Sequence, residues 1–172
     1  MAVLATHRAT DRDIPSLERL CAEAAKTVTL WSHRRERLNP GAWISSRVPV
    51  TVVADGADAI GFAAALSDNV PLGSAKCAEA IAYVVPSHRR RGAARGALSE
   101  LLSVTRTMGL WKLVVYSLAD DAAARALLDR MDFRAVGTLV KHLQIEGSWR
   151  DVTLHERLVL SARKSMPSIP EV

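Results

Sequence analysis

Cysteine is scarce in this chain of 172 residues, which has only two, Cys21 and Cys77. They lie far apart in the sequence, so they match neither the spacing of a zinc site nor that of a redox-active pair. Two reduced thiols are typical of proteins from a reducing compartment. We therefore expect a cytoplasmic protein with no metal site.

Long apolar segments are also missing. No run approaches the ~18 residues that a membrane-spanning helix needs, and the first ten residues, MAVLATHRAT, lack the apolar core of a signal peptide. We expect no membrane association. No linker divides the chain and no internal repeat is visible, so the sequence predicts one domain over residues 1–160. The remaining segment, 161–172, carries two prolines and is expected to be a flexible tail.

Aromatic residues make up only 5% of the chain, whereas the 23 basic residues outnumber the 18 acidic ones and give a formal net charge of +5. A positive charge favours an anionic partner, such as nucleic acid, a membrane surface or a phosphorylated small molecule. A nucleic-acid surface needs basic side chains over a whole face, with aromatic side chains to stack on single strands. Here the arginines gather in one short segment, so we expect no nucleic-acid partner.

The hydrophobic pattern predicts an α+β or mixed α/β fold. Its order is a strand, two helices, three strands, a helix, a strand, a helix and two strands. Hairpin turns are indicated at Asp55-Gly56-Ala57 and at Glu146-Gly147. Thr10 and Asp121 are expected to cap helices. The strands are predicted at residues 3–9, 48–55, 58–66, 77–85, 110–118, 133–145 and 148–160.

The segment YVVPSHRRRGAARGALSELL, residues 83–102, places four arginines and two glycines where a strand ends and a helix begins. The first backbone N–H groups of a helix have no internal partner, and the helix dipole makes that end positive, so such an end binds phosphate. Gly92 allows a ligand to approach the backbone closely. The pattern is neither a Walker A loop nor a dinucleotide-binding turn. It suits a ligand with several phosphates, although a merely solvated basic turn would look the same by charge alone.

Arg89-x-x-Gly92-x-Ala94 fits the [Q/R]-x-x-G-x-[G/A] signature of the GCN5-related N-acetyltransferases, the GNAT family. The stretch AEAIAYVVPSHRRRGAARG, with TVTL at 27–30 and GSWRDV at 147–152, resembles the phosphinothricin or L-amino acid type within that family. The resemblance implies a single-domain GNAT-like fold, with a twisted, mostly antiparallel sheet of roughly six or seven strands flanked by helices. It also implies acetyl-CoA as the co-substrate and a homodimer.

The resemblance further assigns site residues. The strand before the turn would offer its backbone to the pantetheine arm and thioester, and the turn would hold the pyrophosphate. Asp121 stands where the family usually has an asparagine that contacts the cofactor. Leu30, Trp31 and Trp149 are the candidates for binding the acceptor. The full set of cofactor-binding candidates is Ala82, Tyr83, Val84, Arg89, Arg90, Arg91, Gly92, Ala93, Ala94, Arg95 and Asp121.

Glu79 is the candidate catalytic residue. It aligns with the glutamate that the phosphinothricin type uses as general base, and strand alternation puts it on one face with Ile81 and Tyr83. An amine must lose a proton to attack a thioester, and a carboxylate that is partly desolvated is a stronger base. On its own, a glutamate near a strand start would more readily be a solvated side chain.

Three positions depart from the family pattern. Leu128 replaces a tyrosine or histidine near the thiol and cannot donate a proton, which leaves the general acid open. Asp121 for asparagine places a negative charge near a phosphate-rich ligand. Asp132 replaces a usual glycine, for which the sequence offers no explanation. The cluster Arg34, Arg35 and Arg37 could attract a substrate carboxylate, but a solvated face is the simpler interpretation.

The sequence therefore predicts an acetyl-CoA-dependent N-acetyltransferase that acts on the primary amine of a small molecule, first of all an amino acid or an amino-acid-like antimetabolite. Two alternatives stay open. The acceptor could be a protein amine or an aminoglycoside, or the chain could bind an acyl-CoA without catalysis.

Overall fold

The structure is a computed structural model, and it describes residues 4–27, 37–67 and 76–159. The strands are β1 (Leu4–Arg8), β2 (Val50–Asp55), β3 (Asp58–Leu66), β4 (Cys77–Val84), β5 (Lys112–Leu118), β6 (Arg134–Ile145) and β7 (Ser148–Leu158). The α-helices are α1 (Ile14–Thr27), α3 (Pro40–Ser45), α4 (Ala93–Thr107) and α5 (Ala122–Arg130). Two short 3-10 helices are η1 (Asp11–Asp13) and η3 (Pro86–His88).

All seven strands form one sheet, in the order β1-β2-β3-β4-β5-β7-β6. Every neighbouring pair is antiparallel except β4 and β5, which are parallel and are joined by α4. Parallel neighbours need a crossover connection, and α4 provides it. The α+β class, the twisted, mostly antiparallel sheet and the two predicted hairpins are therefore confirmed.

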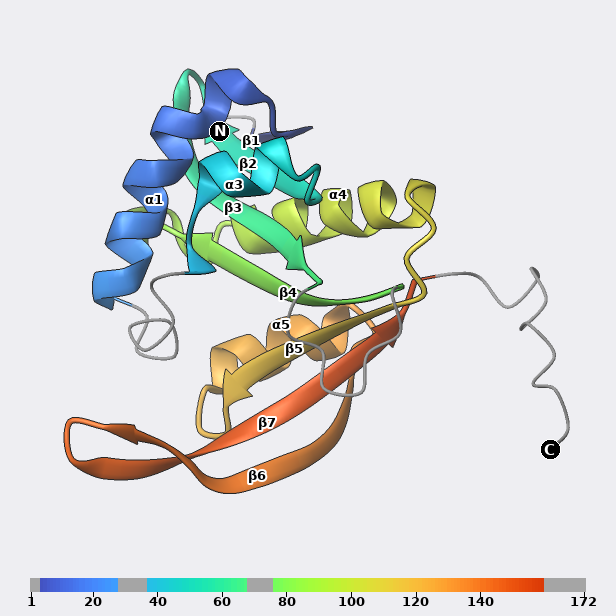
Figure 1. Cartoon of the computed structure of the whole chain (residues 1–172). Helices are drawn as coiled ribbons and strands as arrows, with labels where there is room; N and C mark the ends of the chain where they lie inside the picture. Colours follow the sequence, from blue (N-terminus) through green and yellow to red (C-terminus); the bar gives the residue numbers. More distant parts are fainter. Residues whose placement is uncertain (1–3, 28–36, 68–75, 160–172) are drawn as a thin grey trace, which may run out of the picture.

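The helices lie on both faces of the sheet (Figure 1). Because successive side chains of a strand point to opposite faces, β3 and β4 contribute to two separate cores. One core joins these strands to α1 and α3 and contains Leu17, Leu20, Trp43, Phe62 and Tyr83. The other lies under α4 and α5 and contains Ala63, Ala80, Leu98, Leu101, Leu113 and Leu128.

The predicted helix caps are confirmed. Thr10 precedes η1, and its backbone N–H donates to Oδ2 of Asp13 at 2.8 Å, which holds the entry to α1. The carboxylate of Asp121 accepts a hydrogen bond from the backbone N–H of Ala124 at 2.9 Å and so caps α5.

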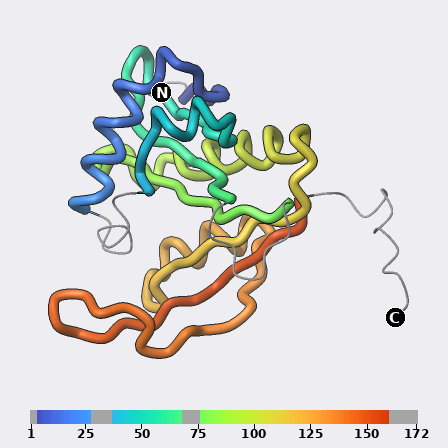
Figure 2. The backbone as a smooth tube through the Cα atoms, in the orientation of Figure 1, coloured from blue at the N-terminus to red at the C-terminus, as the bar shows by residue number. Residues whose placement is uncertain are grey.

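The β6–β7 hairpin extends away from the body of the molecule, as the backbone trace shows (Figure 2). Nearly all of β6 is exposed, and it forms one edge of the sheet. The predicted tail, 161–172, lies outside the described residues. Within the described part, no helix is long and apolar enough to cross a membrane.

Candidate active site

Strands β4 and β5 are paired only at their beginnings. The pairing joins Cys77–Glu79 to Lys112–Val114. Beyond this point β4 stays paired with β3 and β5 with β7, so the two parallel strands part. The two strands diverge in the described structure (Figure 1), which leaves a gap in the sheet between them. Glu79 belongs to the last pair before this gap.

The backbone of β4 presents alternate residues to this gap. The N–H of Val85 donates to the carbonyl of Ile60 at 2.9 Å, and the pairing with β3 continues from there without a shift. Since successive residues of a paired strand direct their backbone groups to opposite edges, Tyr83 is directed toward β3. Ala82 and Val84 are directed toward the gap. The alternation therefore favours Ala82 and Val84 as backbone partners of a ligand in the gap.

The turn between η3 and α4 contains two residues in the left-handed backbone conformation, Arg90 with φ 63° and Gly92 with φ 87°. A positive φ is uncommon for a residue other than glycine, and such backbone strain clusters at functional sites. Gly92 is the N-cap of α4 and supplies no capping side chain. A Cβ added to Gly92 would meet no atom within 4 Å, so the space over the helix start is open. The helix N–H groups, the missing side chain and the open space fit a bound phosphate group.

The four arginines of the turn fall into two groups. Arg89 donates from Nε to the carbonyl of Val84 at 3.0 Å, and Nη1 of Arg91 lies 3.7 Å from Oδ2 of Asp55. Arg90 and Arg95 are exposed and form no ion pair among the described residues. Arg89 and Arg91 therefore brace the turn, whereas Arg90 and Arg95 are available to an anion.

Glu79 is buried, with a side chain only 4% exposed, and its Oε2 accepts a hydrogen bond from Nη1 of Arg37 at 2.9 Å. Its face of β4, shared with Ile81 and Tyr83, is as predicted. Glu79 is therefore half of a buried ion pair. One expectation needs correction. Arg37 does not belong to a solvated face, because its side chain is only 17% exposed. Arg34 and Arg35 lie outside the described residues.

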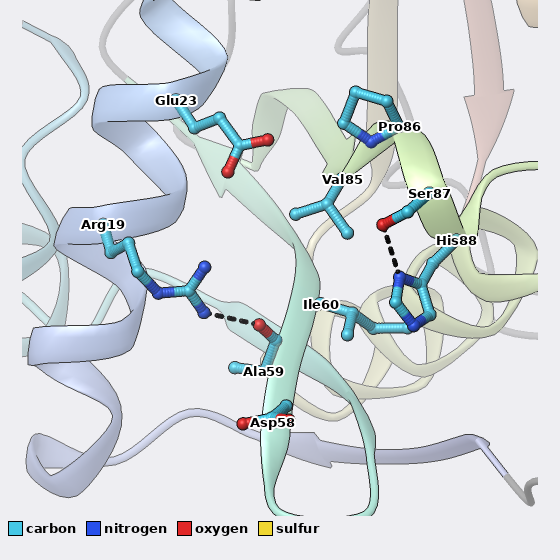
Figure 3. Close-up of a pocket in the computed structure, with 9 residues that line it drawn as sticks. All are labelled: Arg19, Glu23, Asp58, Ala59, Ile60, Val85, Pro86, Ser87 and His88. Carbon is cyan, nitrogen blue, oxygen red and sulfur yellow. Dashed lines mark hydrogen bonds between the residues drawn. The ribbon is translucent and has the colours of Figure 1, made fainter.

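An open pocket of about 540 Å³ lies at the other end of β4, between α1 and η3 (Figure 3). Arg19, which donates to the carbonyl of Ala59 at 2.7 Å, and Glu23 reach it from α1. Glu23 also accepts a hydrogen bond from the hydroxyl of Tyr83 at 2.8 Å, and burial raises the pKa of this tyrosine. No sequence pattern singled out Arg19 or Glu23, since opposite charges four residues apart are common on helix surfaces. None of the predicted site residues lines this pocket.

Helix α5 explains two of the departures from the family pattern. Leu128 is 3% exposed and packs in the core with Met131 and Phe133. The helix ends with hydrogen bonds from the Asp132 N–H to the Asp129 carbonyl and from the Phe133 N–H to the Leu128 carbonyl. This Schellman motif requires a left-handed residue after the cap, and Asp132 adopts φ 56°. Glycine suits the position for this reason, and aspartate fills it under strain.

Of the three acceptor candidates, the structure describes Trp149 alone. Trp149 lies on the β6–β7 hairpin and is 57% exposed. Leu30 and Trp31 lie outside the described residues. Trp43, by contrast, is a core residue.

His155 of β7 is a deeply buried polar residue. It is 1% exposed, and its Nε2 lies 3.1 Å from Oγ of Ser117 on β5. Its Nδ1 has no hydrogen-bond partner among the described residues. Burial lowers the pKa of His155, so the imidazole is neutral at physiological pH.

A model of the acetyltransferase (GNAT) family matches residues 13–133. Three solved structures show the same fold over most of the chain. An N-acetyltransferase from Staphylococcus aureus Mu50 is 21% identical, with a TM-score of 0.79, and the match covers 92% of this chain and 99% of that chain. The ribosomal-protein-alanine N-acetyltransferase of Brucella melitensis is 25% identical, with a TM-score of 0.77 and coverage of 90% and 99%. A phosphinothricin acetyltransferase from Sinorhizobium meliloti, solved in complex with acetyl-CoA, is 18% identical, with a TM-score of 0.77 and coverage of 92% and 89%. No curated protein matches the sequence.

Proposed function

Since the chain belongs to the GNAT family of acetyl-CoA-dependent N-acetyltransferases, whose model spans residues 13–133, we propose that it acetylates the primary amine of a small molecule. The acceptor is an amino acid or an amino-acid-like antimetabolite. The observation that carries this proposal is the gap between β4 and β5. It has a buried carboxylate where the strands part, and after β4 ends comes a turn whose open helix start fits a phosphate group.

Acetyl-CoA supplies the acetyl group and a thiol leaving group when it is bound. Ala82 and Val84 would receive the pantetheine arm along the free edge of β4, with Tyr83 packed behind them. The helix start at Gly92, Ala93 and Ala94 would hold the pyrophosphate. The arginines Arg89, Arg90, Arg91 and Arg95 and the helix cap Asp121 would complete the cofactor site.

Glu79 acts as the general base of this proposal. The acceptor amine reaches the enzyme mainly as an ammonium ion, which has no lone pair. Glu79 removes its proton, and the neutral amine then attacks the thioester. Leu128 is packed in the core and provides no general acid. A thiol with an ordinary pKa of ~8.5 leaves as thiolate without one.

The position of Glu79 supports its role. It stands at the vertex of the gap, on the strand whose free edge would hold the thioester. It is also shielded from water, which strengthens its electrostatic interactions with an incoming cation. A solvated, idle glutamate at a strand start would not be buried in this way.

A second acceptor class, the N-terminal amine of a protein, is favoured by the likeness to the Brucella ribosomal-protein-alanine enzyme. A protein acceptor is much larger than a free amino acid. The site around Glu79 must therefore be open to solvent for a protein N-terminus, whereas it can enclose a free amino acid.

The two classes are tested together. The purified protein is mixed with acetyl-CoA and a panel of free amino acids, phosphinothricin, an aminoglycoside and a peptide that begins with alanine. Release of free thiol is followed, and the acetylated product is identified by mass spectrometry. Acetylation of a free amino acid or of phosphinothricin supports the proposal. Acetylation of the peptide alone would assign the acceptor to the second class, protein N-termini. Coenzyme A binding without thiol release would show a protein that binds the cofactor without catalysis.

We also propose a homodimer in which the exposed edge strand β6 pairs with β6 of a second copy. Val136, Leu139 and Val140 are exposed on this strand, and Val140 is 71% exposed. An unpaired edge of apolar residues is a template for strand addition, and antiparallel pairing of the same strand satisfies two-fold symmetry. Light scattering should give twice the monomer mass, and Val140→Lys should give a monomer. A monomeric wild type would contradict this assembly.

A further inference from the structure

Ser117 of β5 and His155 of β7 form a buried polar pair, with Oγ of Ser117 3.1 Å from Nε2 of His155. His155 is paired with Val115 in the sheet, so its side chain points to the same face as those of Val115 and Ser117. Among the buried side chains of the described residues, Nδ1 of His155 alone has no hydrogen-bond partner. An orphaned polar atom in a core lowers stability. The pair is therefore better explained by a function than by stability.

Ser117 lies beside the gap between β4 and β5. The last pair of the two parallel strands joins Glu79 to Val114. Ala82 and Ser117 each come three residues later, and parallel strands advance together, so these two residues stand at the same level across the gap. The side chain of Ala82 packs against the core under α4 and α5, as does that of Val115. Ser117 shares this face, because it follows Val115 by two residues.

Glu79 points to the other face of the sheet. It alternates with Ala82 along β4 and shares its face with Ile81 and Tyr83, which belong to the core under α1 and α3. The proposed base and the hydroxyl of Ser117 therefore flank the gap from opposite faces. Attack of an amine on a thioester creates a positive charge on nitrogen and a negative charge on sulfur. A base on one face and a hydrogen-bond donor on the other can serve these two charges separately.

The tautomer of His155 decides what the hydroxyl of Ser117 can do. Burial is the main cause that lowers the pKa of His155, while Asp129 of α5 raises it and Arg125 of α5 lowers it further. The imidazole is thus neutral and carries one hydrogen. A buried N–H without an acceptor is rarer than an unused acceptor, so the unpartnered Nδ1 favours the hydrogen on Nε2. Nε2 then donates to Oγ of Ser117, and the single hydrogen of the hydroxyl is directed elsewhere.

We propose that Ser117, positioned by His155, donates a hydrogen bond to the sulfur of coenzyme A as the thioester breaks. This inference rests on the proposed function and adds a catalytic residue to it. A hydrogen bond to an ionised acceptor is roughly twice as strong as one between neutral groups. The hydroxyl therefore stabilises the thiolate more than the thioester, and such a difference accelerates the step. Ser117 serves the position that Leu128, packed in the core, cannot serve.

The covalent step balances with these residues. Glu79 takes one proton from the ammonium of the acceptor, and the nitrogen lone pair attacks the carbonyl carbon. The C–N bond forms, the C–S bond breaks, and the electron pair leaves with sulfur. The nitrogen releases its second proton to water as the amide forms. Ser117 keeps its own proton throughout, and the released thiolate takes a proton from water.

The first test needs neither cofactor nor acceptor. Nuclear magnetic resonance of the 15N-labelled protein distinguishes a ring nitrogen that carries a hydrogen from one that does not. The hydrogen of His155 should reside on Nε2, with Nδ1 unprotonated. A hydrogen on Nδ1 would direct the hydroxyl of Ser117 to the imidazole and would overturn the inference.

The second test measures the ionisation of bound coenzyme A, because a thiolate absorbs in the ultraviolet and a thiol does not. Each protein is titrated with pH, and the complex with desulfo-coenzyme A, which lacks the thiol, is subtracted. Loss of a hydrogen bond to a charged group should make the thiol ionise about one pH unit higher in Ser117→Ala than in the wild type. Ser117→Thr keeps the hydroxyl and should resemble the wild type.

Two further pairs of variants separate positioning from packing. His155→Leu should raise the pH of thiol ionisation, and His155→Gln, which keeps an N–H near Ser117, should restore part of the wild-type value. Thr105 is a buried residue of α4 whose hydroxyl donates to the carbonyl of Leu102 at 3.1 Å. Thr105→Val loses a buried hydroxyl away from the gap, so it is the control and should ionise the thiol as the wild type does.

The outcomes distinguish this inference from the proposed function. With an acceptor that is acetylated, Ser117→Ala should lower kcat about tenfold and leave KM for acetyl-CoA nearly unchanged. Equal thiol ionisation in the wild type and in Ser117→Ala would overturn the inference and leave the proposed function standing. If no amine is acetylated but the thiol ionises as expected, the proposed function fails and the hydrogen bond to sulfur stands. A protein that binds no coenzyme A would overturn both.

Discussion

The turn between η3 and α4 and the Arg37–Glu79 pair lie at opposite ends of β4, and they are made of different parts of the chain. The turn is defined mainly by its backbone conformation. Arg90 and Gly92 have positive φ angles, and the start of α4 has no capping side chain. The pair joins two side chains that are 42 residues apart. In the proposed function the turn would bind phosphate groups of the cofactor, whereas the pair would lie at the acceptor end of the strand.

The largest effect is expected from a substitution of Glu79, which should change turnover without changing cofactor binding. Glu79→Gln keeps the size of the side chain and can still bond to Arg37, but it removes the base. We expect turnover to fall by ~10²–10⁴-fold, the usual contribution of a general base. The affinity for coenzyme A, measured by calorimetry, should not change, because the turn at the other end of β4 is intact. Raising the pH should restore part of the rate, since more of the acceptor is then neutral. Equal turnover of the two proteins at neutral pH would exclude Glu79 from the mechanism.

Leu128 tests whether α5 belongs to the site or to the core. It is 3% exposed among apolar side chains, so Leu128→Ala should lower the free energy of unfolding by ~2–5 kcal/mol. The neighbouring Leu127 only borders that core, and Leu127→Ala should cost clearly less. Urea unfolding of both variants provides the measurement. A stable Leu128→Ala protein with impaired turnover would instead assign Leu128 to the thioester end of the gap.

A substitution of Gly92 tests the cofactor end of the proposed site separately from the acceptor end. We expect Gly92→Val to weaken coenzyme A binding by about tenfold or more, because it fills the space from which the helix N–H groups reach a charged phosphate. Its φ of 87° also strains any side chain, so a matched control is needed. Gly109 follows the other end of α4 with φ 75° and equally open space. Gly109→Val should cost similar stability and bind coenzyme A normally. Equal loss of binding in both variants would mean that strain in α4, not the phosphate site, is responsible.

The same contrast explains what the sequence could reveal. Strand alternation, the turns at Gly56 and Gly147 and the signature around Gly92 are local patterns, and each predicted an element that the structure contains. These features depend on backbone geometry, which neighbouring residues in the sequence determine.

The partners of buried side chains were beyond prediction. Nothing near Arg37 in the sequence indicates that it reaches Glu79, because the contact exists only once α3 packs against the sheet. The burial of His155 likewise depends on the strands and helix around it. Asp132 was unexplained until its φ was known. Tertiary packing decides such contacts, and a local pattern carries no record of it.

The two sides of the sheet differ in what stabilises them. Strands β2 to β4 pack against apolar cores, whereas β5, β7 and β6 are also joined by ion pairs. Glu156 of β7 accepts a hydrogen bond from Lys112 of β5 at 2.7 Å and pairs with Arg134 of β6. The bond from Lys112 is the main cause that lowers the pKa of Glu156 below its ordinary value of 4.5. A lowered pKa means that the pair stabilises the fold above the unfolded pKa, and that this contribution is lost as the pH falls through the folded pKa.

Glu156→Gln should therefore cost about 1 kcal/mol at neutral pH. The difference from the wild type should shrink as the pH falls below the unfolded pKa and through the lowered pKa of folded Glu156, because the carboxylate is then protonated in both states. Unfolding in urea over a series of acidic pH values measures it. A cost that stays constant with pH would show that Glu156 acts through packing and not through its charge.

The smallest effect is expected at the end of α5, where a side chain stands in a position that backbone geometry assigns to glycine. Asp132 has φ 56°, and an L-residue in this region costs ~1–2 kcal/mol, less for aspartate than for most. Its carboxylate is 85% exposed and lies 3.7 Å from Nη2 of Arg157, so the ion pair returns little. Asp132→Gly should raise the free energy of unfolding by about 0.5–1 kcal/mol. Asp132→Ala keeps the strain, loses the ion pair and should not stabilise. If both variants stabilise equally, removal of the charge is the cause; if glycine alone does, the left-handed backbone is.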